Sequence, residues 1–385
     1  MIATTELRKF VIPEIITGID ARFLIDRYLS FFESVHPFIV TDEGVKKQAW
    51  FTEIIEKIQS EVSQFTIFSE VSENPKDTEV HKGLALYINN NCDVIVAIGG
   101  GSPMDCAKGI AIMATNPGNI LDYEGVDLVK NPGPPLCCIP STAGTSADVS
   151  QFAIINDTTR KVKIAIISKK LIPDIALIDP VPLLTMDPNL TACTGMDALT
   201  HAIEAYVSNA SSAITDTHAL EAIRLIAITI EKAISNERNI EDMHAMMMAS
   251  THAGLAFSNA SLGAVHALAH SLGGLLGLPH GECNSILLEH VIDYNYDASP
   301  ERFRKIAEQM IKEKLEDSEV KDALIKKIRS LREGLGIPGE KAIQAKSDAL
   351  LTKLAENAFE DPCLVTNPKA MEIKTMKEIY EKVLE

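Results

Sequence analysis

The first half of the chain alternates short apolar runs with longer segments whose apolar residues recur at helical spacing. The apolar runs, which we expect to be buried strands, cover residues 38–41, 66–68, 93–98, 136–139 and 175–178. Charged segments with helical periodicity, roughly 45–63 and 77–91, separate the first three of them. Because such alternation is typical of parallel sheets covered by helices on both faces, it predicts an α/β domain with a mostly parallel sheet.

The hydrophobic pattern changes after Asp179-Pro180. From about Pro188 onward, helical periodicity covers residues 214–234, 241–259, 262–277 and 300–313. Before the change, residues 152–156 and 162–167 form a candidate hairpin across 156–159. We therefore predict two domains, an α/β domain over residues 1–184 and an all-α domain over residues 185–385.

Length and charge narrow the possible functions. A chain of 385 residues exceeds the size that one hydrophobic core normally organises, which agrees with two domains. The formal net charge of −17 argues against nucleic acid or an anionic membrane as a partner, because both attract basic surfaces. No apolar run approaches the ~18 residues of a membrane span, and residues 1–6 lack the layout of a signal peptide.

Cysteine usage indicates a reducing compartment. The chain has seven cysteines and no CxxC pair, and Cys137 and Cys138 are adjacent within a predicted strand, so they should point to opposite faces. Free thiols of this kind are typical of proteins outside oxidising compartments. We therefore expect a cytoplasmic protein.

Histidines are concentrated in one apolar segment of the second half. His266, His270 and His280 lie within fifteen residues of one another, among Ala, Leu and Gly. Upstream, Asp197 and His201 are four residues apart and therefore project from the same helix face. Buried polar groups need partners, and a divalent metal ion would use one carboxylate and several imidazoles at once. The pattern predicts a divalent-metal site.

The spacing leaves two alternatives open. Asp197 and His201 could instead be a chance pair on a polar helix face, because Glu204 and Tyr206 follow on the same predicted helix. The spacing also does not choose which of the three downstream histidines bind the metal.

A run of glycines follows the third predicted strand. Gly99, Gly100, Gly101 and Ser102 precede a helical segment, so their backbone amides and the positive end of the helix favour an anion such as a pyrophosphate. The alternative is an ordinary strand-to-helix turn, for which one glycine normally suffices. The spacing differs from the dinucleotide-binding GxGxxG pattern.

Two other loops should lie at the same edge of the sheet. Residues 140–146 follow the next strand with several hydroxyl groups, and ligands of open α/β sheets bind beyond the carboxyl ends of strands. An ordinary polar loop is an equal alternative. Asp42 ends the first predicted strand, where it either bonds an adenosine ribose or serves as a turn residue.

Three blocks around these residues resemble the signature of the iron-containing (group III) alcohol dehydrogenase family. They are residues 195–206, 254–270 and 278–281. Shorter segments fall in the order expected of that family, at 74–75, 99–105, 123–125 and 366–368. The similarity covers nearly the whole chain. It implies a Rossmann-like dinucleotide-binding α/β domain followed by an all-α metal-binding domain.

The resemblance assigns roles to individual residues. It implies metal ligands at Asp197, His201, His266 and His280, and an active-site histidine at His270 that does not bind the metal. It implies that the cofactor contacts Asp42, Gly99, Gly100, Gly101, Ser102, Thr142, Thr145 and Lys163. An acid at position 42 favours NAD over NADP, because a carboxylate repels the 2′-phosphate. Asp148 departs from the family pattern, which has Glu there.

The resemblance implies an NAD-dependent enzyme that interconverts a short primary alcohol or diol and its aldehyde. The alkoxide would be bound to a divalent metal, with Fe²⁺ expected first and Zn²⁺ or another ion as alternatives. Phe152 and Phe257 resemble pocket-lining positions, and Phe152 stands where lactaldehyde-reductase relatives tend to carry a polar residue. This favours simple primary alcohols or 1,3-propanediol over 1,2-diols.

Two other activities occur in the same superfamily and are kept as alternatives. One is a zinc-dependent polyol oxidoreductase similar to glycerol dehydrogenase, and the other is a lyase similar to dehydroquinate synthase. The partners expected from the resemblance are a small alcohol or aldehyde and further copies of the chain, in a dimer or a larger homo-oligomer.

Overall fold

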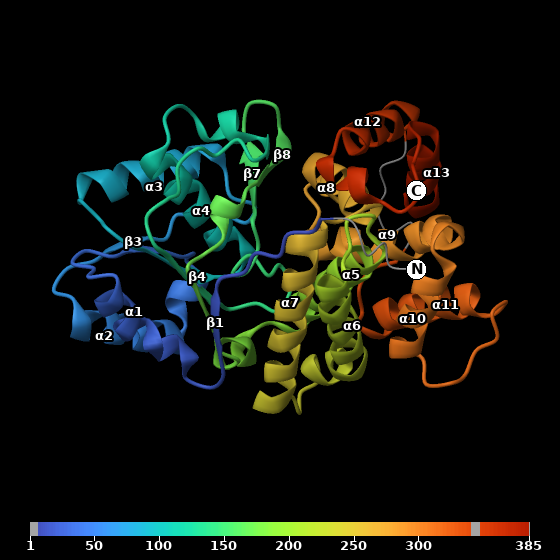
Figure 1. Ribbon diagram of the computed structural model, residues 1–385, viewed down its shortest axis with the longest axis horizontal. Coiled ribbons are helices and arrows are strands. Elements are labelled where there is room, and N and C mark those ends of the chain that lie inside the picture. Colours follow the sequence, from blue (N-terminus) through green and yellow to red (C-terminus); the bar gives the residue numbers. More distant parts are fainter. Residues whose placement is uncertain (1–6, 340–346, 385) are drawn as a thin grey trace. The chain divides into compact units, whose positions relative to one another are not determined.

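The computed structural model describes residues 7–339 and 347–384, and the chain divides into two compact units (Figure 1). One unit is Val11–Met186. The other contains the described residues from Asp187 onward together with residues 7–10.

A parallel sheet forms the centre of Val11–Met186. Within the described residues it has six strands, in the order β1-β9-β6-β4-β2-β3. The strands are β1 (Glu14–Thr17), β9 (Ile175–Ile178), β6 (Leu136–Pro140), β4 (Ile95–Gly99), β2 (Phe38–Val40) and β3 (Thr66–Phe68). Five of them were predicted, and the α/β fold class is confirmed. The edge strand β1 was not predicted.

Successive side chains of the central strands enter two different cores. In β4, Ile95 and Ala97 enter one core, whereas Val96 and Ile98 enter the other. The sheet is therefore apolar on both faces, which is why its strands appear in the sequence as continuous apolar runs. Cys137 and Cys138 of β6 enter opposite cores, and all seven cysteines are buried and free.

Helices cover both faces of this sheet. Figure 1 shows one pair of helices below the strands and another pair above them. The lower pair is α1 (Ile25–Phe31) and α2 (Ala49–Glu61), and the upper pair is α3 (Asp77–Asn89) and α4 (Gly101–Thr115). The glycine run joins β4 to α4, since Gly99 ends the strand and Gly101 begins the helix, and it therefore lies at the carboxyl end of a central strand.

The candidate hairpin is present as two antiparallel strands. They are β7 (Phe152–Asp157) and β8 (Val162–Ile167), and β5 (Gly125–Val126) pairs with β8 in parallel. Together they form a second, three-stranded sheet. One side of it packs on the core that α4 covers, through Ala153, Ile155 and Ile164.

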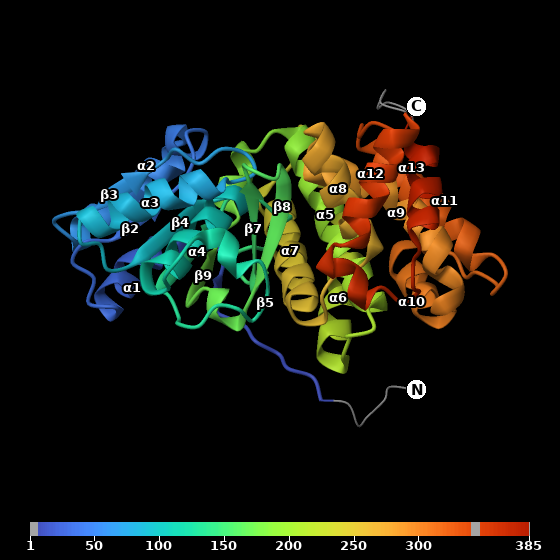
Figure 2. The ribbon, with the colours of Figure 1, turned by 90° about the horizontal axis from the view of Figure 1, so that it is seen from above.

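The second unit is built from helices, as predicted (Figure 2). The helices α5, α6 and α7 pack against one another, and α8 packs on both α9 and α12. Their bounds are α5 (Pro188–Val207), α6 (Ala213–Ala233), α7 (Ile240–Ala260), α8 (Ala264–Leu276), α9 (His280–Asn295), α10 (Pro300–Met310), α11 (Val320–Gly334), α12 (Asp348–Phe359) and α13 (Ile373–Val383).

Residues 7–10 bind to this helical unit. The guanidinium of Arg8 donates hydrogen bonds to the carbonyl oxygens of Asn209 at 3.2 Å and Ser211 at 3.3 Å. The ring of Phe10 stacks on His218, with the ring centres 5.7 Å apart. This grouping differs from the predicted assignment of residues 1–184 to a single domain.

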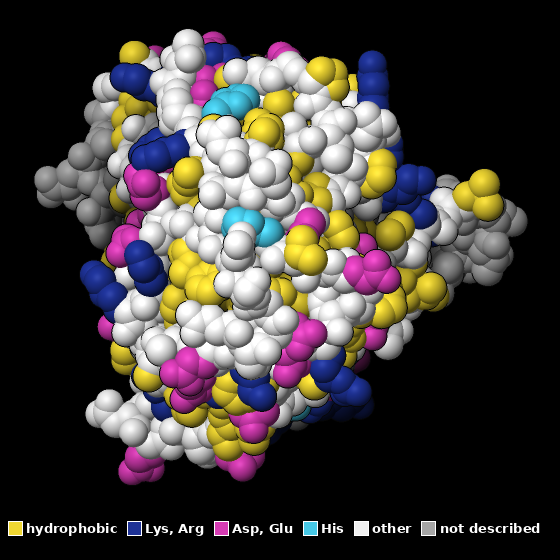
Figure 3. Space-filling view, turned by 90° about the vertical axis from the view of Figure 1, so that its left-hand side faces the viewer, with side chains coloured by type: hydrophobic (Ala, Val, Ile, Leu, Met, Phe, Trp, Pro, Cys, Tyr) yellow, Lys and Arg dark blue, Asp and Glu magenta, His cyan; other side chains and the backbone are white. Residues whose placement is uncertain are grey.

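Charged side chains of both signs are interspersed on the face of the Val11–Met186 unit that Figure 3 shows. Such a surface differs from the continuous basic patch that nucleic acid requires. Among the described residues, none of the helices combines the length and the apolar character that crossing a membrane requires.

Candidate metal centre and cofactor site

Helix α5 carries two of the predicted metal ligands. It begins after Asp187, whose carboxylate caps the first turn by accepting two backbone amides at 2.9 and 3.2 Å. Asp197 and His201 follow on one face and are 3% and 5% exposed. Glu204 and Tyr206 are equally buried, at 4% and 2%. The chance-pair alternative needs an exposed polar face, and α5 has none around these four residues.

The first turn of α8 is held by two side chains from elsewhere in the unit. Because Gly263 has no side chain to cap the helix, Asn367 Oδ1 and Glu204 Oε1 accept the first two amides of α8, at 3.1 and 2.6 Å. A Cβ at position 263 would lie 2.9 Å from Glu204 Oε1 and 3.0 Å from Asn367 Oδ1, so only glycine leaves room. This anchoring fixes His266, which lies in that turn.

Helix α9 begins at His280 and packs closely on α5. A Cβ at Gly281 would overlap the backbone carbonyl of Cys193 in α5, so glycine is required for this approach. The close packing brings His280 to the side of α5 that carries Asp197.

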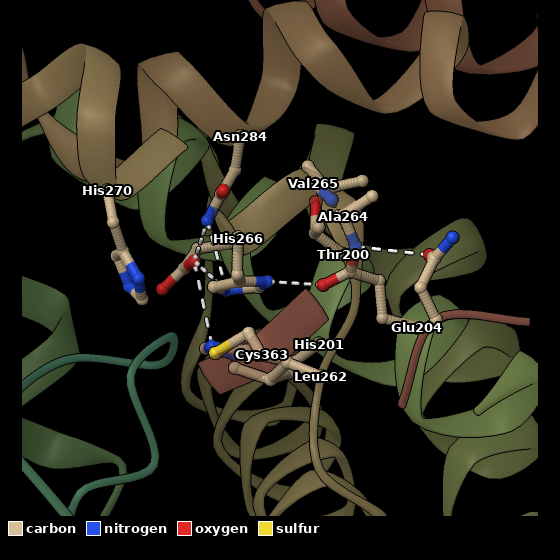
Figure 4. A network of polar contacts seen from close by, with 12 residues as sticks. Thr200, His201, Glu204, Leu262, Ala264, Val265, His266, His270, Asn284 and Cys363 are labelled. Atoms are coloured by element: carbon tan, nitrogen blue, oxygen red, sulfur yellow. Dashed lines mark hydrogen bonds and ion pairs between the residues drawn. The ribbon is translucent and has the colours of Figure 1, made fainter. Parts of the chain in front are cut away.

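Three imidazoles converge on one carboxylate oxygen. Asp197 Oδ1 lies 3.8 Å from Nε2 of His201, 3.7 Å from Nε2 of His266 and 3.6 Å from Nε2 of His280. The ring of His201 is stacked between those of His266 and Phe257, with ring centres 4.6 and 4.3 Å away. Figure 4 shows His201 and His266 within this network.

The donor set fits a divalent metal ion. Ligand atoms bound to one ion at about 2.1 Å are roughly 3 to 3.5 Å apart, so each imidazole lies only a few tenths of an ångström too far from Asp197 Oδ1. Asp197, His201 and His266 also have ligand atoms within 4.8 Å of one another. Imidazole and carboxylate together suit iron, zinc and other first-row ions. The side chain of His280 is 26% exposed, whereas those of the other three are nearly inaccessible, so the site opens to solvent on the His280 side.

Glu204 orients His266 for such a role. Its Oε2 lies 2.5 Å from Nδ1 of His266 and accepts that proton, which leaves Nε2 directed toward Asp197. Burial would raise the pKa of Asp197, but attraction by His201 and His280 and the hydrogen bond from His266 outweigh it and hold the pKa well below its usual range. Asp197 is therefore an ionised carboxylate.

His270 contacts a different carboxylate. Its Nδ1 lies 2.8 Å from Asp361 Oδ2, and its ring stacks on that of His280 with the centres 5.2 Å apart. Asp361 Oδ1 accepts the backbone amide of Cys363 at 2.8 Å. Burial would raise the pKa of Asp361, but His270 and the Cys363 amide lower it. These three residues form a cluster held by hydrogen bonds.

The glycine run lies directly against the two predicted threonines. A Cβ on Gly100 would be 3.1 Å from Thr142 Cγ2, and one on Gly101 would be 2.8 Å from Thr145 Cγ2. Gly99 has a φ of +149°, a conformation that L side chains rarely adopt. Gly100 and Gly101 are partly exposed at the start of α4, where helix amides can bind an anion.

The remaining predicted cofactor residues lie around this loop. Ser102 Oγ accepts the backbone amide of Asn74 at 3.3 Å, and Asn74 Oδ1 accepts Nζ of Lys163 at 2.6 Å. Asp42 Oδ1 accepts two backbone amides of its own turn, at 2.8 and 2.9 Å. This oxygen therefore has the role of a turn residue. Asp42 Oδ2 faces Gly99, 3.6 Å from a Cβ built there.

A fully buried lysine crosses the core behind the loop. Lys108 Nζ donates to the carbonyl oxygens of Ser150 at 2.8 Å and Phe152 at 2.7 Å. Burial lowers the pKa of Lys108 and raises that of Asp148 to about 6. Phe152 is the first residue of β7 in the α/β unit, whereas Phe257 stacks on His201, one of the predicted metal ligands.

Sequence reasoning missed three polar residues of the site. The sequence did mark Glu204, because it follows Asp197 and His201 at helical spacing. It was nevertheless interpreted as part of a possible polar face. Asn284 lies four residues after His280 and so shares its face of α9. Asp361 had no local signal, because it is 91 residues away from His270 in the sequence.

Comparison with known protein families gives two matches in succession. A model described as "Iron-containing alcohol dehydrogenase" matches residues 13–180. A model described as "Fe-containing alcohol dehydrogenase family, C-terminal" matches residues 191–384.

Individual relatives match along most of their length. The chain is 39% identical to a 1,3-propanediol dehydrogenase of Citrobacter freundii, over 89% of this chain and 90% of that protein. It is 36% identical to an NAD-dependent methanol dehydrogenase of Bacillus methanolicus, over 97% and 99%. The crystal structure of a 1,3-propanediol oxidoreductase superposes with a TM-score of 0.93 at 36% identity, covering 98% and 100% of the two chains.

Proposed function

The chain belongs to the iron-containing alcohol dehydrogenase family, and we propose that it catalyses the NAD-dependent interconversion of a short primary alcohol or diol and its aldehyde. The observation that carries this proposal is the convergence of Asp197, His201, His266 and His280 at 3.6 to 3.8 Å. The relatives named above act on alcohols, which favours a dehydrogenase over the glycerol dehydrogenase-like and lyase alternatives.

These four side chains would hold the metal. Fe²⁺ is the expected ion, and Zn²⁺ or another divalent ion is the alternative. A bound divalent ion supplies a Lewis acid that polarises the oxygen of an alcohol or aldehyde. Glu204 accepts the Nδ1 proton of His266, so Nε2 is the atom of this ring that would bind the ion. Phe257 stacks on His201 and restricts the rotation of that ring.

His270 is the proposed group for proton transfer. Its Nδ1 is engaged by Asp361, so Nε2 is the atom that exchanges a proton. Asp361 fixes the orientation of the ring, and stacking on His280 holds it beside the metal ligands.

The α/β unit would bind NAD through the loop that follows β4. The amides after Gly99 and the positive end of α4 suit a pyrophosphate, and Thr142 and Thr145 pack against that loop. Beside this loop, Asn74 forms hydrogen bonds with both Ser102 and Lys163. The carboxylate of Asp42 favours NAD over NADP, because it would repel a 2′-phosphate.

The proposed substrate is a simple primary alcohol or 1,3-propanediol. Phe257 is 4% exposed and lies beside His201, so the surroundings of the metal ligands are apolar on that side. Phe152 is included as a pocket residue on the resemblance alone. Relatives that are named for methanol and for 1,3-propanediol support this range of substrates.

We propose that the enzyme is cytoplasmic, because its seven buried thiols suit a reducing compartment. We also propose a homo-oligomer, a dimer or larger, and light scattering coupled to size-exclusion chromatography would measure its mass.

The test is NADH formation, followed by absorbance at 340 nm. Protein loaded anaerobically with Fe²⁺ is offered ethanol, 1-butanol, 1,2-propanediol and 1,3-propanediol with NAD, and chelator-treated protein is the control. We expect NADH formation that the chelator abolishes, with 1-butanol and 1,3-propanediol ahead of 1,2-propanediol. A protein that forms no NADH with any alcohol, and consumes none with the matching aldehydes, would contradict the proposal.

A further inference from the structure

Asn284 occupies the centre of the metal-ligand cluster, and none of the roles assigned so far includes it. It lies one turn after His280 in α9, is fully buried and points toward His266 in Figure 4. Its Nδ2 lies 2.7 Å from Asp197 Oδ1, 3.2 Å from Nε2 of His266 and 3.2 Å from Nε2 of His280. One amide group therefore touches ligands from three helices, α5, α8 and α9.

The amide is oriented by these ligands. Asp197 Oδ1 belongs to an ionised carboxylate, which can only accept hydrogen bonds, so the amide presents its N–H group to this oxygen at 2.7 Å. An amide oxygen in the same place would be repelled by the carboxylate oxygen. The opposite side of the group, Oδ1, is buried without a hydrogen-bond partner among the described residues. Contacts with the proposed metal ligands therefore fix the orientation, since no described residue bonds to Oδ1.

We propose that Asn284 is a positioning residue that assembles the metal site before the ion arrives. Its shortest contact is to Asp197 Oδ1, the same oxygen that faces all three Nε2 atoms. A carboxylate oxygen can accept this N–H and still direct a second lone pair to an ion. The bond therefore holds the Asp197 side chain in its ligating orientation in both states. The contacts to His266 and His280 give way when their lone pairs are used by the metal.

This inference rests on the metal site of the proposed function and adds a residue to it. Partners that orient metal ligands typically change metal affinity by about 10 to 100-fold when they are removed. A residue that merely fills space would change stability without changing affinity or the spectrum of the bound ion.

The test measures Co²⁺ binding to the whole protein, because Co²⁺ reports its ligand geometry through visible absorption. Asn284→Leu keeps the branched shape and removes both N–H donors. Ser285→Ala is the matched control, because Ser285 is the next residue of α9 and is equally buried, and within the described part of the chain its side chain bonds only to the carbonyl of Gly281 in its own helix. Dissociation constants come from competition with a chromophoric chelator, and the thermal midpoint of each metal-free variant shows that it is folded.

We expect N284L to bind Co²⁺ about 10 to 100-fold more weakly than wild type, with an altered visible spectrum, and S285A to match wild type in both. Asn284→Ser, which is smaller and keeps a hydroxyl, replaces N284L if the latter does not fold, and it too should bind more weakly. Binding by either variant with wild-type affinity and spectrum would overturn the inference, as would tighter binding. A wild-type protein that binds no Co²⁺ would instead contradict the metal site itself, and with it the proposed function.

Discussion

A single carboxylate can serve two helices at once. Glu204 accepts the second amide of α8 through one oxygen and Nδ1 of His266 through the other, while its own helix supplies Asp197 and His201. The two ligand-bearing segments are thereby fixed relative to one another by charge-assisted hydrogen bonds. The residue is buried, so the bonds are not weakened by competing water.

Replacing Glu204 by Gln tests this link. E204Q keeps the size of the side chain and removes its charge, so the Nδ1 proton of His266 is held less firmly. We expect metal affinity to fall about 10 to 100-fold, measured by competition with a chelator. E221Q, which alters an exposed i, i+3 ion pair with Arg224 in α6, should bind metal as the wild type does.

The pairing of His270 with Asp361 predicts a kinetic effect that leaves the metal in place. H270A removes the proposed proton-transfer group, and kcat should fall by about 10²-fold or more. D361N keeps the group but loses the charged acceptor on Nδ1, so its loss should be smaller. Metal content, measured by mass spectrometry, should equal that of the wild type in both. Loss of metal in H270A would make His270 a ligand rather than an acid–base group.

At the scale of elements, hydrophobic pattern predicted most of the sheet for a definite reason. The central strands are buried on both faces, so their apolar runs are continuous. Strand β1 was not predicted, because it lies at the sheet edge and the first and last of its four residues are exposed. Its sequence therefore lacks a continuous apolar run. Helices with an apolar face were also predictable, whereas their packing was not. The contacts that Gly263 and Gly281 allow depend on residues far away in sequence.

The glycine run makes a prediction about the loop between β4 and α4. Gly101→Ala would place a methyl group 2.8 Å from Thr145 Cγ2, so the loop or the threonine must shift. We expect NADH affinity, measured by fluorescence titration, to fall at least about tenfold, which corresponds to about 1.4 kcal/mol.

Gly274 provides the matched control. It is exposed in α8 with no atom within 4 Å of a Cβ built on it. G274A should therefore leave NADH affinity unchanged and raise the free energy of unfolding by up to about 1 kcal/mol, because alanine favours helix. Equal NADH affinities for G101A and wild type would show that the close approach is not required for binding.

At the scale of the molecule, the sequence and the resemblance identified the family correctly. The four proposed metal ligands could be named because a family pattern marks them. Glu204 and Asn284 share helix faces with His201 and His280, but their contacts with His266 cross from one helix to another, and Asp361 is 91 residues away from His270. Polar residues that act through another side chain are recognised only once the helices are packed.

The buried carboxylate of Asp148 should make stability depend on pH. Its pKa is raised from 3.8 to about 6, mainly by burial, so folding favours the protonated form. The stability contributed by that form is fully present below about pH 4 and is lost as the pH rises through about 6. The loss amounts to at most about 3 kcal/mol, at 1.36 kcal/mol for each pKa unit.

Urea unfolding at several pH values checks this expectation. The stability of wild type relative to D148N should fall between pH 4 and pH 6, because Asn does not titrate. D317N removes a carboxylate that is 95% exposed and pairs with Arg304 at the surface, where such pairs contribute little, so its difference from wild type should change much less over the same range. A constant difference for D148N would show that Asp148 is not perturbed.

The chain passes between its two units twice, once after Phe10 and once after Met186. A nick after Met186 would therefore not release the helical unit, because residues 7–10, on the first fragment, remain bound to it through Arg8 and Phe10. A gene truncated to begin at Asp187 would instead lose these contacts and uncover His218. The helical unit is thus not an independent module in the linear sequence, and any exchange of it between relatives must carry a short segment from the other end of the gene.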